Sequence, residues 1–194
     1  MQSREPRLGM GEAIEIAPYD PAWPDAFERE RASILATLGD LVFAIEHVGS
    51  TAVPGLGAKP IIDMMVAVRG VFDDGQRCVA PLQALGYEYM GERGIPGRLF
   101  FATPIPRPRT HHLHMVEPES DFWCRHLLFR DYLRGHPEEA RAYYELKVRL
   151  AARFQADRDA YTEAKTEFIR SVEAKARAAI DSGGQASACR QPEG

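Results

Sequence analysis

The sequence has little of three features that mark particular classes of protein. Its three cysteines are widely spaced and form no Cys-x-x-Cys motif, so neither a disulfide framework nor a zinc knuckle is predicted. No segment approaches the roughly 20 apolar residues that span a bilayer, and the first residues lack the apolar stretch of a signal peptide. Basic residues are not in excess, because the formal net charge is −4. We therefore expect a cytoplasmic protein with neither a membrane nor a nucleic-acid partner.

The remaining composition is that of an ordinary globular domain. The chain has 194 residues, of which 45% are hydrophobic and 27% are charged. This length is enough for one domain with a full hydrophobic core. We expect a flexible leader at residues 1–12, a single domain at 13–181 and a disordered, low-complexity tail at 182–194.

Periodicity and turn residues predict short strands first and helices last. The Pro-rich segment 104–108 is expected to form an exposed hairpin tip, and Ser120 is expected to cap the helix that follows it. This order predicts an α+β fold. The expected strands are residues 13–16, 41–48, 61–68, 87–90, 98–103 and 111–117, and the expected helices are residues 25–38, 73–85, 121–134, 137–155 and 157–180.

A loop of small residues followed by a lone acid forms the first candidate site. Gly49, Ser50 and Thr51 follow an expected strand, and small residues let backbone N–H groups and a hydroxyl reach phosphate oxygens. Lys59 in the same loop would add a positive charge. Asp63 is the one charged residue of the apolar strand 61–68. Its carboxylate would hold a divalent cation, or be paired with a base or hydrogen-bonded at the strand end, since a buried unpaired carboxylate is costly.

Two histidines on a later strand form the second candidate site. Side chains two apart on a strand face the same side, so His112 and His114 point together. Such a pair often binds metal, although it also occurs without one. Together with Asp63 it would suit Mn, Zn or Fe better than Mg. Alternatively, one histidine acts as an acid–base group near neutral pH.

Four longer stretches carry a resemblance to a known family. They are YDPAWP at residues 19–24, IEHVGSTAVPGLGAKPIID at 45–63, HHLH at 111–114 and LFRDYLR at 128–134. Together they resemble the GrpB family, and the resemblance runs from about residue 14 to residue 176. Four late positions are similar to the family too, namely Tyr144, Lys147, Tyr161 and Lys165.

The resemblance implies a nucleotidyltransferase fold, with a small mixed β-sheet, helices packed against it and a helical C-terminal part. In that superfamily Gly-Ser is followed by Asp-x-Asp or Asp-x-Glu and by a third carboxylate, and these acids hold two divalent ions. Gly49, Ser50 and Asp63 match the first parts, but Met65 stands in place of the second carboxylate. GrpB proteins share this departure, and some relatives are fused to dephospho-CoA kinase, which associates the family with nucleotide or coenzyme A metabolism.

Three arginines are further candidates for binding phosphate. Arg98 opens the strand expected beside the histidine strand, and Arg130 and Arg134 lie one helical turn apart. Guanidinium groups bind phosphate in bidentate fashion. The alternative for the helical pair is a solvated helix face.

Taken together, these residues predict a metal-dependent nucleotidyl or phosphoryl transferase acting on a small molecule. Asp63, His112 and His114 are the expected metal ligands and catalytic residues, and the ion would be Mn, Zn or Mg. The expected partner is a nucleotide or another phosphate-bearing small molecule. Two alternatives stay open: a nucleotide- or phosphate-binding module without catalysis, which Met65 favours, and a metal-dependent hydrolase.

Overall fold

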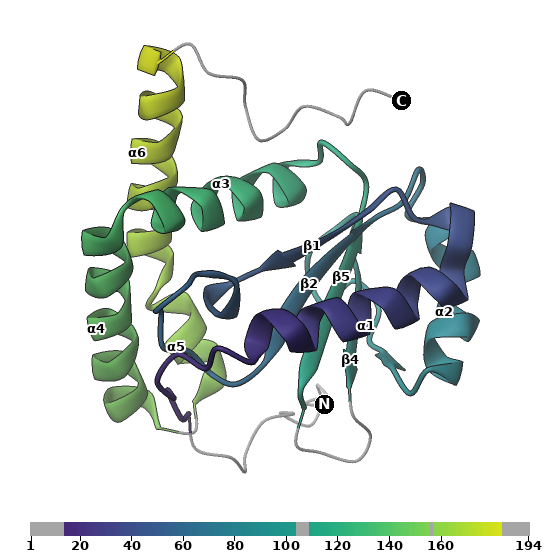
Figure 1. The fold of residues 1–194 in the computed structure, drawn as a ribbon, viewed down its shortest axis with the longest axis horizontal. Helices are drawn as coiled ribbons and strands as arrows, with labels where there is room; N and C mark the ends of the chain where they lie inside the picture. Colours follow the sequence, from purple (N-terminus) through teal and green to yellow (C-terminus); the bar gives the residue numbers. More distant parts are fainter. Residues whose placement is uncertain (1–13, 104–108, 156, 184–194) are drawn as a thin grey trace, which may run out of the picture.

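A five-stranded mixed sheet lies at the centre of the molecule (Figure 1). The computed structural model describes residues 14–103, 109–155 and 157–183. The strand order is β1-β2-β5-β4-β3; β2 and β5 run parallel, and the other neighbours are antiparallel. The strands are β1 (Ala44–Val48), β2 (Ile62–Ala67), β3 (Glu88–Tyr89), β4 (Leu99–Thr103) and β5 (His111–Val116).

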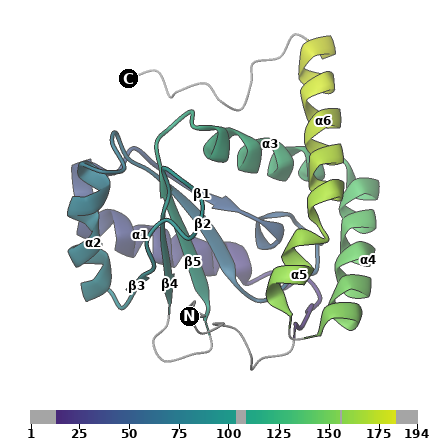
Figure 2. The ribbon, with the colours of Figure 1, turned by 180° about the vertical axis from the view of Figure 1, so that it is seen from behind.

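Helices pack against both faces of this sheet. One face is covered by α1 (Trp23–Leu38) and α2 (Asp74–Ala84), whose apolar side chains join the larger core. The other face is partly covered by α3 (Asp121–Gly135). Beside it gather α4 (Pro137–Phe154), α5 (Arg158–Glu163) and α6 (Thr166–Gly183), as the reverse view in Figure 2 shows. Among the described helices, none combines the length and apolar character needed to cross a bilayer.

Alternation along β2 and β5 separates the core from the candidate site. The parallel register pairs Asp63 with His112 and Met65 with His114, and neighbouring side chains in a sheet share a face. The intervening residues of both strands, among them Met64 and Leu113, belong to the core under α1 and α2. The predicted clustering of Asp63 with both histidines on one face therefore follows from strand register.

The predicted α+β class is confirmed, and most elements lie within a few residues of their expected bounds. The Ser120 hydroxyl accepts a hydrogen bond from the Trp123 N–H at 3.3 Å, so the predicted cap of α3 is confirmed.

Two of the predicted elements are wrong. The strand at residues 13–16 is absent from its described part; Ile14 packs on Leu150 and Tyr161, and the nearest pairing is a lone bridge between Ala17 and Ala58. The apolar residues of this segment are thus buried against helices rather than in a sheet. The single helix at 157–180 is in fact α5 and α6, which are separated at residues 164–165.

Three expectations fall largely on residues outside the described ranges. They are the leader at residues 1–12, the hairpin tip at 104–108 and the tail at 182–194, apart from residues 182 and 183, which end α6.

Candidate functional site

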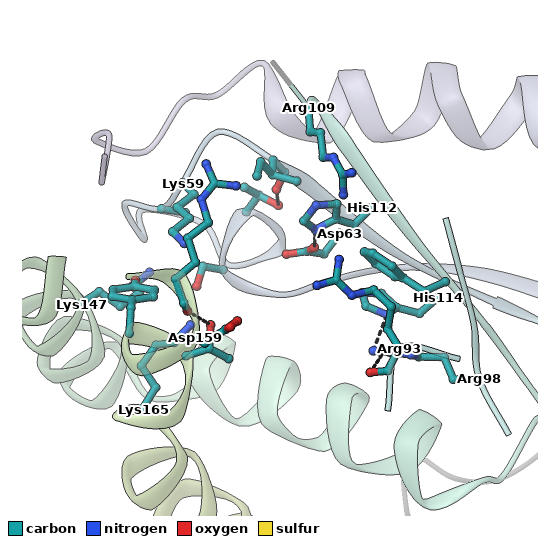
Figure 3. Close-up of a pocket in the computed structure, with 18 residues that line it drawn as sticks. Lys59, Asp63, Arg93, Arg98, Arg109, His112, His114, Lys147, Asp159 and Lys165 are labelled. Carbon is teal, nitrogen blue, oxygen red and sulfur yellow. Dashed lines mark hydrogen bonds and ion pairs between the residues drawn. The ribbon is translucent and has the colours of Figure 1, made fainter. Parts of the chain in front are cut away.

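A cavity of about 430 Å³ opens on the sheet face that carries Asp63 (Figure 3). Its walls come from the loop after β1, from β2, β4 and β5, from the helices α4 and α5, and from Lys165 between α5 and α6. The charged lining is strongly cationic, although the net charge of the whole chain is −4. In the described part of the chain, two carboxylates, Asp63 and Asp159, face seven cations: Lys59, Arg93, Arg98, Arg109, Lys147, Arg158 and Lys165. Such a lining suits an anionic ligand.

Gly49 makes room for the carboxylate of Asp63. Val48 pairs with Asp63 in the antiparallel ladder, so the turn after β1 passes directly over that side chain. Gly49 has a φ of 70°, and a Cβ placed on it would lie 2.7 Å from Asp63 Oδ2. Ser50 and Thr51, which follow in the turn, line the cavity, whereas Gly49 is not among the lining residues. The role of Gly49 is thus to leave space for the Asp63 carboxylate, and it does not contact a ligand in the cavity directly.

Asp63 and His112 form a hydrogen-bonded pair at the centre of the cavity. His112 Nδ1 lies 3.0 Å from Asp63 Oδ1, and both side chains are partly exposed to the cavity. Burial raises the pKa of Asp63, but the hydrogen bond from His112 and the nearby positive charges outweigh it, so the pKa lies below its usual value. Asp63 is therefore ionised at neutral pH and orients the imidazole. This pairing leaves Nε2 of His112 as the nitrogen available to a ligand.

His114 lies deeper and is held by an arginine. Its Nδ1 is 3.4 Å from Arg98 Nη1, and its ring packs between Phe100 and Phe122. Burial lowers the pKa of His114 to about 3, against the opposing effect of Asp63, so the ring is neutral at physiological pH. His114 therefore supports the cavity wall and does not exchange protons near pH 7.

The predicted ligand set does not assemble into a metal centre of the expected kind. Asp63 and His112 are hydrogen-bonded to each other. His114 accepts a hydrogen bond from the guanidinium of Arg98, whose positive charge would repel a metal cation. Met65, where the superfamily pattern has its second acid, is fully buried in the core with Val48. Within the described residues, no three His, Cys, Asp or Glu side chains are grouped so that they could hold an ion. These residues do not fit a two-ion centre.

Three lysines lie in or beside the cavity without an acidic partner. Lys59 and Lys165 each place Nζ over the Tyr161 ring, at 4.3 and 4.4 Å from its centroid. Lys147 donates to the carbonyl oxygen of Gly57 and is 3% exposed. Among the described residues, no carboxylate forms an ion pair with any of the three.

Burial makes these lysines costly to protonate. Desolvation first, and then the neighbouring positive charges, lower the pKa of Lys59 to about 8 and that of Lys147 to about 7. Burial also lowers the pKa of Lys165 to about 8, although Asp63 opposes the shift. Buried cations without partners are uncommon unless a ligand supplies the opposite charge.

The predicted arginines separate into two places. Arg98 lines the cavity, as does Lys59. Arg130 instead binds Glu46, Asp131 and the carbonyl oxygen of His47, and it is buried between β1 and α3. Arg134 donates to the carbonyl oxygen of Ala52 and lines a second cavity of about 450 Å³, which Thr51 also touches. Arg130 therefore holds β1 and Arg134 holds the turn after it, both from outside the cationic cavity.

Several lining residues carry no site prediction from sequence reasoning. Arg93 and Arg109 lie in loops without periodicity, and Arg158 opens the short helix α5. Lys147 could have been identified from the sequence, because it falls in the buried stripe of α4 between Tyr143 and Leu150. A lysine at such a position is seldom buried unless something pairs with it.

The chain is similar in sequence and in structure to several known proteins. A family model described as GrpB protein matches residues 13–175. A UPF0157 protein of Pseudomonas aeruginosa is 46% identical over 170 residues, which cover 86% of this chain and 69% of that protein. The crystal structure of the conserved protein GrpB from Enterococcus faecalis matches with a TM-score of 0.79 at 36% identity, covering 88% of this chain and 100% of that chain. A dephospho-CoA kinase of Mycolicibacterium paratuberculosis is 27% identical over 198 residues, 88% of this chain and 48% of that protein.

Proposed function

The chain belongs to the GrpB family, as its motifs predicted, and we propose that its cavity binds a nucleotide or another small phosphate-bearing molecule and transfers a nucleotidyl or phosphoryl group from it. One observation carries this proposal. Among the described residues, seven cations and two acids line the cavity. Arg109 pairs with Glu88, but three of the cations are lysines without an acidic partner in the described part of the chain. Phosphate oxygens would supply the missing negative charge.

The central pair supports transfer rather than binding alone. Asp63 holds His112 through Nδ1, which leaves Nε2 to take the proton of an acceptor hydroxyl. The hydroxyl oxygen then forms a bond to phosphorus while the bond to the leaving phosphate oxygen breaks, and the leaving group keeps that electron pair. Lys59 and Lys165 are placed to neutralise its charge.

Two further features support the proposal. The Gly-Ser turn after β1 beside Asp63 in β2 is the arrangement expected of a nucleotidyltransferase fold, in a mixed sheet with helices on both faces. The similarity to a dephospho-CoA kinase covers 48% of that enzyme, and it places a related segment within a protein named for phosphoryl transfer.

In this role His112 acts on the acceptor hydroxyl, and binding of a divalent ion is a separate question. Whether Mn, Zn or Mg binds remains a prediction. Isothermal titration with each ion, with and without nucleotide, measures it directly.

The lysines provide the test of binding. Lys165→Met keeps an unbranched side chain of nearly the same length but removes its charge. We expect at least about a tenfold loss of affinity for ATP or tripolyphosphate, since a contact to a desolvated charge contributes about 1.5–3 kcal/mol. Lys175→Met is the matched control, because Lys175 lies on α6, which begins directly after Lys165, and pairs with Glu139 outside the cavity. Equal losses in the two variants would contradict the proposal.

Turnover is tested separately. The protein is incubated with ATP and candidate acceptors, and release of phosphate or pyrophosphate is followed. His112→Gln should abolish release while ATP affinity changes by less than about threefold. If ATP binds but remains intact with every divalent ion and acceptor tried, the protein is a binding module and the transfer step is rejected.

A further inference from the structure

Five of the cavity cations form two separate groups. The lysine group is Lys59, Lys147 and Lys165, and the arginine group is Arg93 and Arg98. In Figure 3 the lysine group lies to the left of the Asp63–His112 pair, and the arginine group lies below the pair and to its right. The central pair thus has a cationic region on each side.

The lysine group is arranged around one aromatic ring. Two of its ammonium groups share the Tyr161 ring, and the charge of Lys165 disfavours the charged forms of both other lysines. The hydroxyl-bearing residues Ser50 and Thr51 also line the cavity. Several ammonium groups that repel one another suit a ligand with several adjacent negative charges, such as a polyphosphate.

The arginine group is arranged around another ring. The guanidinium carbons of Arg98 and Arg93 lie 5.2 and 5.9 Å from the Phe100 centroid. Arg98 is 7% exposed, and within the described ranges its acceptors are all neutral, namely the carbonyl oxygens of Glu92 and Arg93 and the ring of His114.

Neither arginine is neutralised by the protein. The pKa of Arg98 is lowered by burial and by the charge of Arg93, and its Nε is buried without a hydrogen-bond partner. Within the described residues, no acid forms an ion pair with either side chain. Arg98 is thus a buried guanidinium beside the charge of the exposed Arg93, and an anion from outside the protein would supply the missing opposite charge.

A single polyphosphate bound to the lysine group would not supply negative charge to the arginine group, because the Asp63–His112 pair lies between the two groups. We propose that the acceptor substrate is itself a small anion, whose carboxylate or phosphate group is bound by Arg93 and Arg98 while its hydroxyl faces His112. This inference rests on the proposed transfer function and names the class of its second substrate. The planar guanidinium fork matches both oxyanions, and the Phe100 ring offers an apolar surface beside them.

The test is a titration of two anions on the full-length protein. Tripolyphosphate is added to saturation first, and inorganic phosphate or malonate is then titrated by calorimetry. We expect a second binding event that survives saturation. Comparing phosphate with malonate shows which oxyanion the arginine group prefers.

The variants separate the two groups. Arg93→Gln, at an exposed position, should weaken the second anion at least about tenfold and change tripolyphosphate affinity less than about threefold. Arg98→Lys keeps the charge but removes the fork and should weaken the same anion. Lys165→Met should show the opposite pattern. Arg141→Gln removes an exposed charge outside the cavity lining and serves as the control for net charge.

Each outcome decides between the two proposals. If tripolyphosphate binds but blocks phosphate and malonate completely, or if Arg93→Gln weakens all anions equally, the cavity is one continuous site. The second-substrate inference is then overturned while the proposed function stands. If tripolyphosphate does not bind at all, the proposed function fails as well.

Discussion

The sheet face under α1 and α2 and the sheet face that carries the cavity are built from alternate residues of the same strands. Met64 and Leu113 on the first face are fully buried among apolar side chains. Asp63 and His112, each next to one of them in sequence, are partly exposed to a cationic cavity. We call these the closed face and the open face.

The difference shows where stability and binding are located. The closed face gains free energy by removing apolar surface from water. The open face keeps buried positive charges that oppose folding until an anion joins them. Substitutions on the two faces should therefore have opposite signatures, and the following predictions test that division.

The largest effect is expected on the closed face. Leu82 is fully buried where α2 packs on the sheet. Leu82→Ala should lower the free energy of unfolding by about 2–5 kcal/mol, since it removes buried methyl groups and leaves a cavity. Urea denaturation measures the change, and sulfate affinity of the folded variant serves as the comparison. If the free energy of unfolding fell by less than about 1 kcal/mol, or if sulfate affinity changed strongly, stability and anion binding would not be divided between the two faces.

The pH dependence of the open face comes next. Burial lowers the pKa of Lys147 to about 7 and those of Lys59 and Lys165 to about 8, compared with about 10.4 in an unfolded chain. Sulfate keeps its charge between pH 6.5 and 9.5, so any change reports on the protein. We expect sulfate affinity to fall by roughly tenfold over this range, as the lysines lose their protons.

The stability of the anion-free protein should respond in the opposite sense. Between about pH 7 and 10 the unfolded chain holds more protons on these lysines than the folded chain does. Their contribution to the free energy of unfolding therefore rises with pH. The Lys147→Met variant should show a smaller pH dependence in both measurements. Parallel trends of affinity and stability, or identical profiles for the variant and the parent, would show that these lysines do not control the cavity.

The smallest effect is expected at the centre of the open face. Asp63→Asn removes a negative charge from a cationic cavity and should raise sulfate affinity by about two- to fivefold, since one charge at 4 Å in water contributes about 1 kcal/mol. The free energy of unfolding should change little, because the side chain is 33% exposed. Weaker sulfate binding would show that Asp63 organises the anion site instead of opposing it. The same variant tests the metal prediction, because stoichiometric metal retained without this carboxylate would rule it out as a ligand.

Local patterns were sufficient to predict most of the fold. The apolar run at 61–68 predicted a central strand, and alternation at 111–117 predicted that His112 and His114 share a face. The break between α5 and α6 was missed because neither Gly nor Pro lies there. It follows Ala164, at a point where Lys165 lines the cavity.

Tertiary pairing decided the parts of the site that local patterns could not predict. Arg130 and Arg134 were placed correctly on one helix face, but the direction of that face depends on Glu46, which lies 84 positions from Arg130. Lys147 shows the reverse case, in which a charged residue inside a buried stripe was a usable local signal.

The close approach of Gly49 to Asp63 constrains how this family can change over evolutionary time. Any larger residue at position 49 would meet the Asp63 carboxylate at 2.7 Å and would also be strained at a φ of 70°. A side chain is therefore acceptable at position 49 only after the acid at position 63 has been lost or displaced. The two positions are epistatic in one direction: losing the acid removes the contact with a side chain at position 49 and leaves only the backbone strain, whereas keeping the acid leaves both.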